Sequence, residues 1–253
     1  MPRDVEAFDR DYAHVLRSLW FLGDVHGKFE HIARALDAAD DVPRWLVFLG
    51  DLEIPDRPFR EILTELLPSS SDVQALFIHG NHDADSHQHW EMLHDCGSAA
   101  QIHGRVVDVD GVRIAGIGGN FMGRVWYPPS DALFQSKATA MNRGSFQWRE
   151  GQRPNPKLNA AIYPQDFQRL SKQRADILVS HEAPSCHPYG FGAIDELARA
   201  MSVCRTFHGH QHDDRSAEYQ KVRNNLGFDA MAVGLRAIKD GLGTVIAEGE
   251  SVW

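Results

Sequence analysis

The sequence predicts an α/β fold with mixed β-sheets, on the basis of three observations. Short apolar runs rich in β-branched and aromatic residues end directly in polar motifs, which is typical of buried strands. Segments with helical spacing of apolar residues lie between these runs, and such alternation indicates an α/β protein. Two further stretches place an Asp-Gly pair between apolar arms, which predicts antiparallel hairpins. Parallel and antiparallel strands are therefore both expected.

Five runs are expected to form strands, and a polar motif follows each of them. They are residues 19–22 before Gly23 and Asp24, 45–49 before Gly50 and Asp51, 75–78 before the motif at 79–83, 177–179 before Ser180 and His181, and 203–207 before the motif at 208–212. Ligands of open α/β sheets bind at the carboxyl ends of the strands. All five motifs are expected at that edge.

Three segments have apolar residues at i, i+3, i+4 and i+7, and we expect helices at 29–36, 59–66 and 194–201. The predicted hairpins turn at Asp110-Gly111 and Asp240-Gly241. No internal repeat is visible, so one domain over residues 1–253 is expected. Residues of about 120–164 lose periodicity and are rich in Pro, Gly, Ser and aromatic residues; long segments of this kind are usually functional or disordered.

Composition narrows the classes of function. The chain has 253 residues, of which 43% are hydrophobic, and 26 Lys and Arg against 35 Asp and Glu give a net charge of −9. Binding to extended nucleic acid or to an anionic membrane is therefore not expected. No run of eighteen apolar residues and no signal-like N-terminus occurs, so a cytoplasmic location is predicted. The three cysteines have neither disulfide-framework nor zinc-finger spacing.

The motifs at the strand ends supply metal-binding groups. They contain Asp24 and His26 in GDVHG, Asp51 in GDLE, Asn81 and His82 in GNHD, His181 in SHEAP, and His210 and His212 in GHQH. Carboxylates and imidazoles without a thiolate suit manganese, iron or zinc, and these are too many ligands for one ion. A single Gly-Asp pair is more often a turn, and alternating histidines can line a strand. Their joint occurrence at five strand ends favours a metal site.

In their order the motifs resemble those of the calcineurin-like metallophosphoesterases, which carry DxH, GD, GNH followed by Asp or Glu, a His, and GHxH. The resemblance spans residues 24–212. It implies a four-layer αββα sandwich with two mixed β-sheets and a centre of two divalent metal ions, foremost manganese or iron, with zinc as a further option. Asp24, His26 and His212 would hold the first ion, Asn81, His181 and His210 the second, and Asp51 would bridge both.

The resemblance also implies a reaction. The chain would hydrolyse phosphate mono- or diesters of a small molecule or nucleotide, by attack of a hydroxide that bridges the two metals. His82 would stay off the metals and act on the substrate, with Asp83 orienting its ring. A positioned acid of this kind contributes roughly 10²–10⁴-fold to the rate. The oligomeric state is left open.

Three other functions use similar residues. Ser/Thr-type protein phosphatases follow GD with Val, Asp-Arg and Gly, whereas GDLEIPDRP places Asp56 and Arg57 further downstream; they also carry arginine where this chain has His79. A nuclease would use a similar centre, and the net acidity disfavours extended nucleic acid but not short nucleotides. A non-catalytic interaction scaffold of the same fold is less favoured, because every expected ligand is present.

The irregular insert at about 120–164 is a candidate substrate flap. Between Phe134 and Ala161 it has five basic residues and one acid, a local balance of +4: Lys137, Arg143, Arg149, Arg153 and Lys157 against Glu150. Trp126, Tyr127 and Trp148 lie in or near it, and aromatic rings can stack on a nucleobase. The alternative is a solvated variable loop. Glu53 has two interpretations as well, a group that supports the ligands or a solvated turn.

Overall fold

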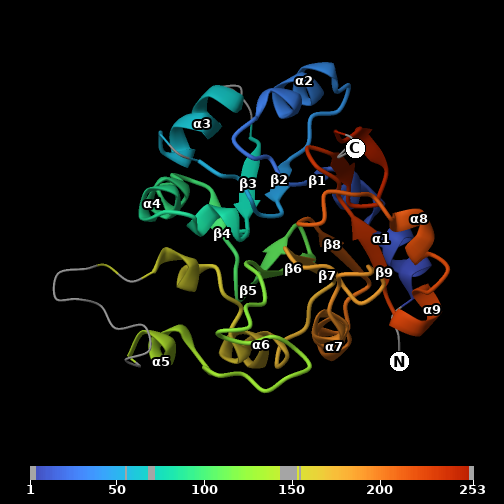
Figure 1. Ribbon diagram of the computed structural model, residues 1–253. Helices are drawn as coiled ribbons and strands as arrows, with labels where there is room; N and C mark the ends of the chain where they lie inside the picture. The colour runs from blue at the N-terminus through green and yellow to red at the C-terminus, as the bar shows by residue number, and fades with distance from the viewer. Residues whose placement is uncertain (1–3, 55, 68–71, 143–152, 154, 251–253) are drawn as a thin grey trace.

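Two β-sheets lie face to face in the middle of the molecule, with helices against the outer face of each (Figure 1). The structure is a computed structural model that describes residues 4–54, 56–67, 72–142, 153 and 155–250. The order of layers is helix, sheet, sheet, helix. It confirms the expected α/β class and the four-layer αββα sandwich with two mixed sheets.

The first sheet has six strands in the order β11-β10-β1-β2-β3-β4. Strands β1 to β4 are parallel, and β10 is antiparallel to both of its neighbours. Their bounds are β1 Leu19–Leu22, β2 Trp45–Phe48, β3 Gln74–Phe77, β4 Ala100–Gln101, β10 Ile238–Asp240 and β11 Val245–Ala247. Three of the predicted strands and the second predicted hairpin are confirmed here.

The second sheet has five strands in the order β5-β6-β7-β8-β9, of which β6 to β9 are parallel and β5 is antiparallel to β6. Their bounds are β5 Arg105–Val109, β6 Val112–Ile117, β7 Ile177–Ser180, β8 Arg205–His208 and β9 Asp229–Ala232. The predicted β5-β6 hairpin is confirmed. Asp110 and Gly111 have φ of 50° and 89°, as a tight turn that matches the twist of the strands requires.

Helices cover the outer faces with their apolar sides. Those on the first sheet are α2 Glu30–Ala38, α3 Phe59–Leu66 and α4 His87–His94, and those on the second are α6 Pro164–Leu170, α7 Gly192–Met201, α8 Ser216–Tyr219 and α9 Arg223–Leu226. The periodicity predicted α2, α3 and α7. Helix α1, Val5–Arg17, instead packs Phe8 and Leu16 on the core between the sheets. In the part of the chain that the structure describes, no helix is long and apolar enough to span a bilayer.

The core between the sheets aligns them. Phe21 of β1 and Phe207 of β8 are fully buried, and their rings stack with centroids 3.8 Å apart. Each strand continues from this core into one of the polar motifs. Because β1 and β8 are matched across the sandwich, the motifs that follow them end up side by side.

The insert is more ordered than its lack of periodicity suggests. Within it, α5 (Lys137–Asn142) and the 3₁₀ helix η3 (Pro156–Asn159) lie beside a small apolar cluster of their own. The cluster consists of Val125, Phe134, Ala140, Leu158, Ala161 and Tyr163. Arg143, Trp148, Arg149 and Glu150 lie outside the described residues. A flap role for the insert stays a prediction.

Candidate metal centre

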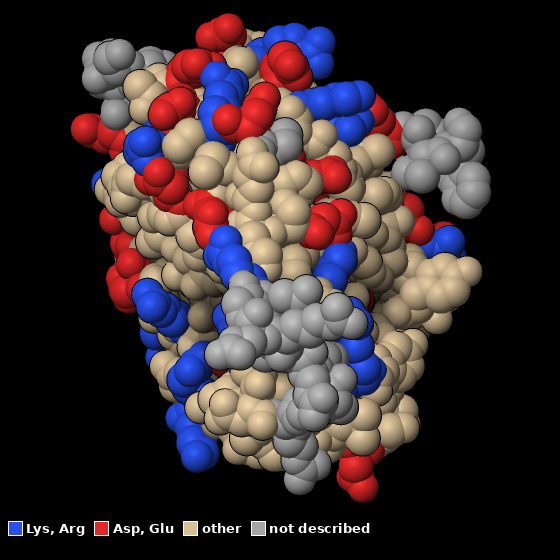
Figure 2. Space-filling view, turned by 60° about the vertical axis from the view of Figure 1, so that its left-hand side comes forward, with Lys and Arg blue, Asp and Glu red and all other residues tan. Residues whose placement is uncertain are grey.

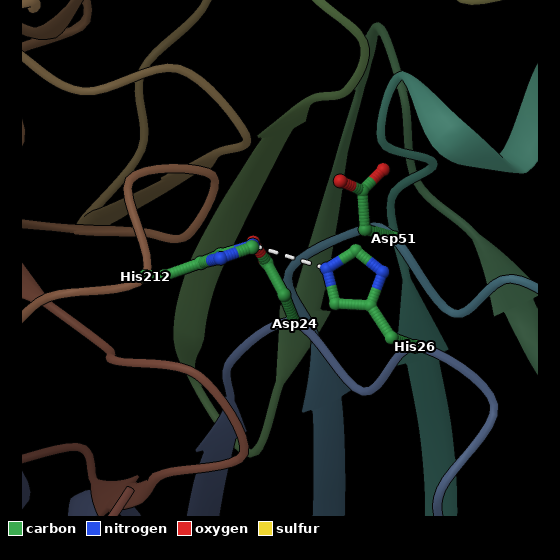
Figure 3. Close-up of side chains that lie close together, drawn as sticks. All are labelled: Asp24, His26, Asp51 and His212. Carbon is green, nitrogen blue, oxygen red and sulfur yellow. Dashed lines mark hydrogen bonds and ion pairs between the residues drawn. The ribbon is translucent and has the colours of Figure 1, made fainter. Parts of the chain in front are cut away.

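The loops after β1, β2, β3, β7 and β8 converge and bring the predicted ligands into two groups. Nitrogen or oxygen atoms of the first group lie within 4.8 Å of one another and come from Asp24, His26, Asp51 and His212 (Figure 3). The second group comes from Asp51, His181 and His210. Asp51 belongs to both. Asn81 joins the second group, since its Oδ1 lies 3.1 Å from His181 Nε2.

The first group leaves a buried acceptor unsatisfied. Nε2 of His26 and Nε2 of His212 lie 3.0 Å apart, and His212 Nε2 lies 2.9 Å from Asp24 Oδ2. Asp24 Oδ1 is buried and has no hydrogen-bond partner among the described residues. The other nitrogen of His26, Nδ1, pairs with Glu53 Oε2 at 2.8 Å. A carboxylate only accepts, so Nδ1 carries the proton and Nε2 is free to bind a cation.

The second group also presents acceptors to one point. His181 Nδ1 donates to the Leu49 carbonyl at 2.9 Å, which leaves a lone pair on Nε2 when the ring is neutral. That Nε2 lies 3.3 Å from Asp51 Oδ2 and 3.1 Å from Asn81 Oδ1. Lone pairs facing one another in a buried place require a positive charge between them. The donor chemistry of both groups therefore fits divalent cations.

The pKa values of the residues without metal also indicate that the site favours positive charge. Burial works against a charged His181 ring, but Asp51 and Asp24 outweigh it and raise the pKa of His181 to about 10. Burial also works against the Asp51 carboxylate, yet His181 and the His82 N–H lower its pKa far below the usual range. His210 faces mainly burial and the neighbouring His181, which lower its pKa to about 4.

The backbone at the ligands is strained. His26, Asp51, His210 and His212 have φ between 45° and 68°, and Glu53 has φ of 53°. A residue other than glycine costs roughly 1–3 kcal/mol in such a conformation, and residues of this kind concentrate at functional sites. Four of the five are predicted ligands, and the fifth supports one of them.

Glycines in the motifs provide space for ligands from neighbouring loops. A Cβ on Gly80 would lie 2.1 Å from Asp51 Oδ1, and a Cβ on Gly209 would lie 2.3 Å from Asp24 Oδ1. At Gly50 it would lie 2.5 Å from His181 Nδ1. The glycines of the GD, GNH and GH motifs therefore belong to the centre as much as the ligands do.

The expectation that Asp83 orients His82 is wrong. The buried Asp83 accepts hydrogen bonds from the backbone of Glu53 at 2.7 Å and Gly80 at 2.8 Å, so it braces two loops. His82 Nδ1 pairs instead with Asp85 Oδ2 at 2.9 Å. The reason is the 3₁₀ turn η1, His82–Ala84, which points residue 83 inward and residue 85 towards the ring. Burial lowers the pKa of His82, but Asp85 and Asp51 outweigh it and raise that pKa.

The sequence motifs do not single out Asp85 or Glu182, and they leave two interpretations of Glu53 open. Asp85 lies three residues after His82, a spacing at which side chains of a helical turn meet, so this signal was present. Glu182 is buried and its Oε2 lies 3.9 Å from His210 Nε2. Glu53, His82 and Asp85 also come within 4.8 Å. The Glu53 carboxylate already pairs with His26, and the Asp85 carboxylate already pairs with Lys157.

Three cations of the insert, Lys137, Arg153 and Lys157, contact protein groups. Lys157 pairs with Asp85, Arg153 pairs with Glu91 of α4, and Lys137 lies 5.7 Å from the centre of the Trp90 ring. Figure 2 shows the face on this side of the molecule, where Lys and Arg predominate in the lower half and Asp and Glu in the upper half. The positive charge of the insert thus serves first to dock it beside α4 and η1.

Of the three expected aromatic residues, the structure describes Trp126 and Tyr127. Trp126 and Tyr127 line an open pocket of about 600 Å³ together with Tyr189 and Phe191, and none of the predicted ligands lines it. His79, before the GNHD motif, is buried and packs against Trp90 and His103 with ring centroids 5.0 and 4.7 Å away. Its role is in packing.

Comparison with known proteins agrees with this geometry. The sequence model of the calcineurin-like phosphoesterase family matches residues 17–214, which include all the predicted ligands. The chain belongs to this family. An uncharacterized protein of Haemophilus influenzae is 35% identical over 219 residues, which are 84% of this chain and 92% of that protein. The crystal structure of TT1561 of Thermus thermophilus is similar in fold, with 15% identity, a TM-score of 0.50, and 88% of this chain and 94% of that chain covered.

Membership in the calcineurin-like phosphoesterases indicates a hydrolase that acts on phosphoesters with divalent metal ions. The resemblance drawn from the five motifs is thereby confirmed. The identity of the metals and the cytoplasmic location stay predictions.

Proposed function

We propose that this calcineurin-like phosphoesterase hydrolyses phosphate mono- or diesters of small molecules or nucleotides at a centre of two divalent ions. The observation that carries the proposal is the position of Asp51, whose carboxylate belongs to two separate groups of nitrogen and oxygen ligands. Asp24, His26 and His212 would hold one ion, and Asn81, His181 and His210 the other. Manganese, iron or zinc suits these donors.

When bound, two such ions lower the pKa of a bound water and neutralise charge on the phosphate oxygens. The protein's part in the reaction falls to His82, whose side chain is 45% exposed and whose ring centroid lies 5.7 Å from that of His26. Water adds to phosphorus, and the bond to the leaving oxygen breaks with its electron pair. That oxygen takes the proton of His82 Nε2. The neutral ring keeps its proton on Nδ1, hydrogen-bonded to Asp85. It regains the Nε2 proton from the water that reacted.

Two features favour small substrates, one of them against phosphoproteins and the other against extended nucleic acid. His79 occupies the place of the arginine of Ser/Thr-type protein phosphatases, and it is only 1% exposed, so it does not reach a substrate phosphate. The net charge of −9 disfavours extended nucleic acid, but not a short nucleotide. A scaffold function is disfavoured, because the full set of ligands is retained and four of them keep a strained backbone.

The test combines metal analysis of the purified chain with rates on four substrate types. These are a phosphomonoester, a phosphodiester, a 2′,3′-cyclic nucleotide and a 3′,5′-cyclic nucleotide, each with added manganese. We expect about two metal ions per chain and turnover of at least one type. A chain that binds two ions and hydrolyses none of the four would favour the scaffold function. One ion per chain overturns the two-metal centre.

A further inference from the structure

Lys157 of the insert contacts Asp85, the carboxylate that pairs with the proposed acid, His82. Its Nζ donates to the backbone carbonyl of Asn81 at 2.9 Å and pairs with Asp85. The other oxygen of that carboxylate, Oδ2, accepts from His82 Nδ1 at 2.9 Å. One carboxylate therefore joins a cation of the insert to the ring of His82, and the same cation ties down the backbone just before it.

The backbone around Lys157 is held on both sides. Asn155 accepts a hydrogen bond from the Lys157 N–H at 3.0 Å and so caps η3, while Pro156 begins that helix. The next residue, Leu158, is fully buried in the apolar cluster of the insert, and Tyr163 donates its hydroxyl to the Leu158 carbonyl at 3.0 Å. The Cα of Lys157 is thus held in place, and the side chain extends towards Asp85.

Stability alone does not account for this arrangement. The side chains of Lys157 and Asp85 are 29% and 33% exposed. Ion pairs this open to solvent contribute typically about 0–1 kcal/mol to stability. Asp85, however, has two oxygens and two partners, and a carboxylate held by Lys157 is fixed in its rotation. A fixed carboxylate keeps a hydrogen on Nδ1 of His82 in both the charged and the neutral ring, and it directs Nε2, which carries the transferable proton, away from itself.

We propose that Lys157 is a positioning residue for His82 and acts through the carboxylate of Asp85. The inference rests on the proposed phosphoesterase function, and it gives the insert a defined part in that reaction. Proton transfer to a leaving oxygen requires hydrogen-bond distance, so a ring that turns freely is a weaker acid catalyst. The contribution of Lys157 is then greatest for esters whose leaving oxygen needs a proton most.

Two variants and one matched control isolate this role. Lys157→Met keeps most of the length and packing of the side chain but removes the donor, and Lys157→Arg restores a donor. Arg153→Met removes another ion pair between the insert and the body, Arg153 with Glu91, which does not involve His82. Rates are measured on esters that the wild type hydrolyses, with leaving groups from p-nitrophenol to a simple alcohol.

For Lys157→Met we expect unchanged metal content, a fall in kcat of roughly 10–100-fold with alcohol leaving groups and less than about threefold with p-nitrophenol. Lys157→Arg should recover most of the loss, and Arg153→Met should match the wild type. In a Lys157→Met, His82→Ala double variant the two losses should not add, because both act on one ring. Equal loss on all leaving groups, no loss, or additive losses overturn the positioning role.

A spectroscopic measurement tests the role without catalysis. Nitrogen-15 spectra of the His82 ring are recorded above its pKa, where the ring is neutral, and are assigned with His82→Ala. They should show one Nδ1-protonated tautomer in the wild type and in Arg153→Met. A mixture of tautomers is expected in Lys157→Met, and an unchanged spectrum overturns the inference. Should the wild type hydrolyse no phosphoester, the proposed function fails, while the spectra still decide whether Lys157 positions the ring.

Discussion

Asp51 Oδ2 lies 3.3 Å from Nε2 of His181, so a carboxylate that follows β2 of the first sheet meets an imidazole that follows β7 of the second. The other oxygen of Asp51 accepts from the His82 N–H at 2.8 Å. One side chain therefore connects the two ligand groups and the loop that carries the proposed acid. The centre is most vulnerable at this residue.

Asp51→Asn should disrupt the two-metal centre, because a carboxamide offers one oxygen where two groups need a carboxylate. We expect loss of at least one ion and a fall in turnover larger than the 10–100-fold that is usual for residues supporting a ligand. Metal analysis and rates measure this. Asp56→Asn, on the exposed continuation of the same loop, is the control and should change neither. A variant with full metal content and full rate would refute the bridging role.

His82→Ala should keep both metals and lose most turnover, about 10²–10⁴-fold, because the ring lies outside both ligand groups and is proposed to act on the substrate. The measurement is metal content beside kcat. His14→Ala, at an exposed histidine of α1, is the control. If the variant loses metal, His82 is a ligand and its assignment is wrong.

Gly80→Ala should damage the centre without altering any ligand, since the added Cβ would lie 2.1 Å from Asp51 Oδ1. We expect lower metal affinity and at least a tenfold loss of rate, about the cost of a displaced ligand support. Gly192→Ala is the matched control, because a Cβ there meets nothing within 4 Å. Titration of manganese into the metal-free proteins compares the two, and equal affinities would contradict the steric role.

Removal of the metals should lower the melting temperature. A ligand present at 1,000 times its dissociation constant stabilises the folded state by about 4 kcal/mol. For a chain of this size each kcal/mol corresponds to roughly 2–4 °C, so chelation should lower Tm by roughly 8–16 °C. Calorimetry before and after chelation, with manganese restored as control, measures the shift. Identical melting curves at saturating manganese would show that no structural cation binds.

Much of the fold was predictable because its signals are local. The strands at 19–22, 45–48 and 177–180 are apolar runs that end in turn residues, and the β5-β6 hairpin has an Asp-Gly turn. Helix α1 escaped prediction because its charged residues mask a buried face that is formed only by contact with the inter-sheet core. The order of the insert was hidden likewise, since it depends on a small cluster drawn from both of its ends.

The site, like the fold, has parts that local sequence signals predict and parts that depend on contacts between distant residues. The ligands follow strands directly, so their placement comes from the sheet edge itself, and the structure gathers all seven. The sequence alone does not decide whether Asp83 or Asp85 pairs with His82. The 3₁₀ turn decides it, because it points the two side chains in different directions. Lys157 lies 72 residues from Asp85 in the chain, and no spacing rule connects residues so far apart.

The stacked rings of Phe21 and Phe207 have a meaning for chemistry as well as for folding. Both ligand groups draw members from each of the two sheets, so the distance between the sheets would determine how far apart the two proposed ions lie. The ring pair precedes Asp24 and His210 by three residues each, and it acts as a spacer for the centre. A change of volume at this ring pair would thus shift the two ligand groups relative to each other from the apolar interior, while every ligand stays the same.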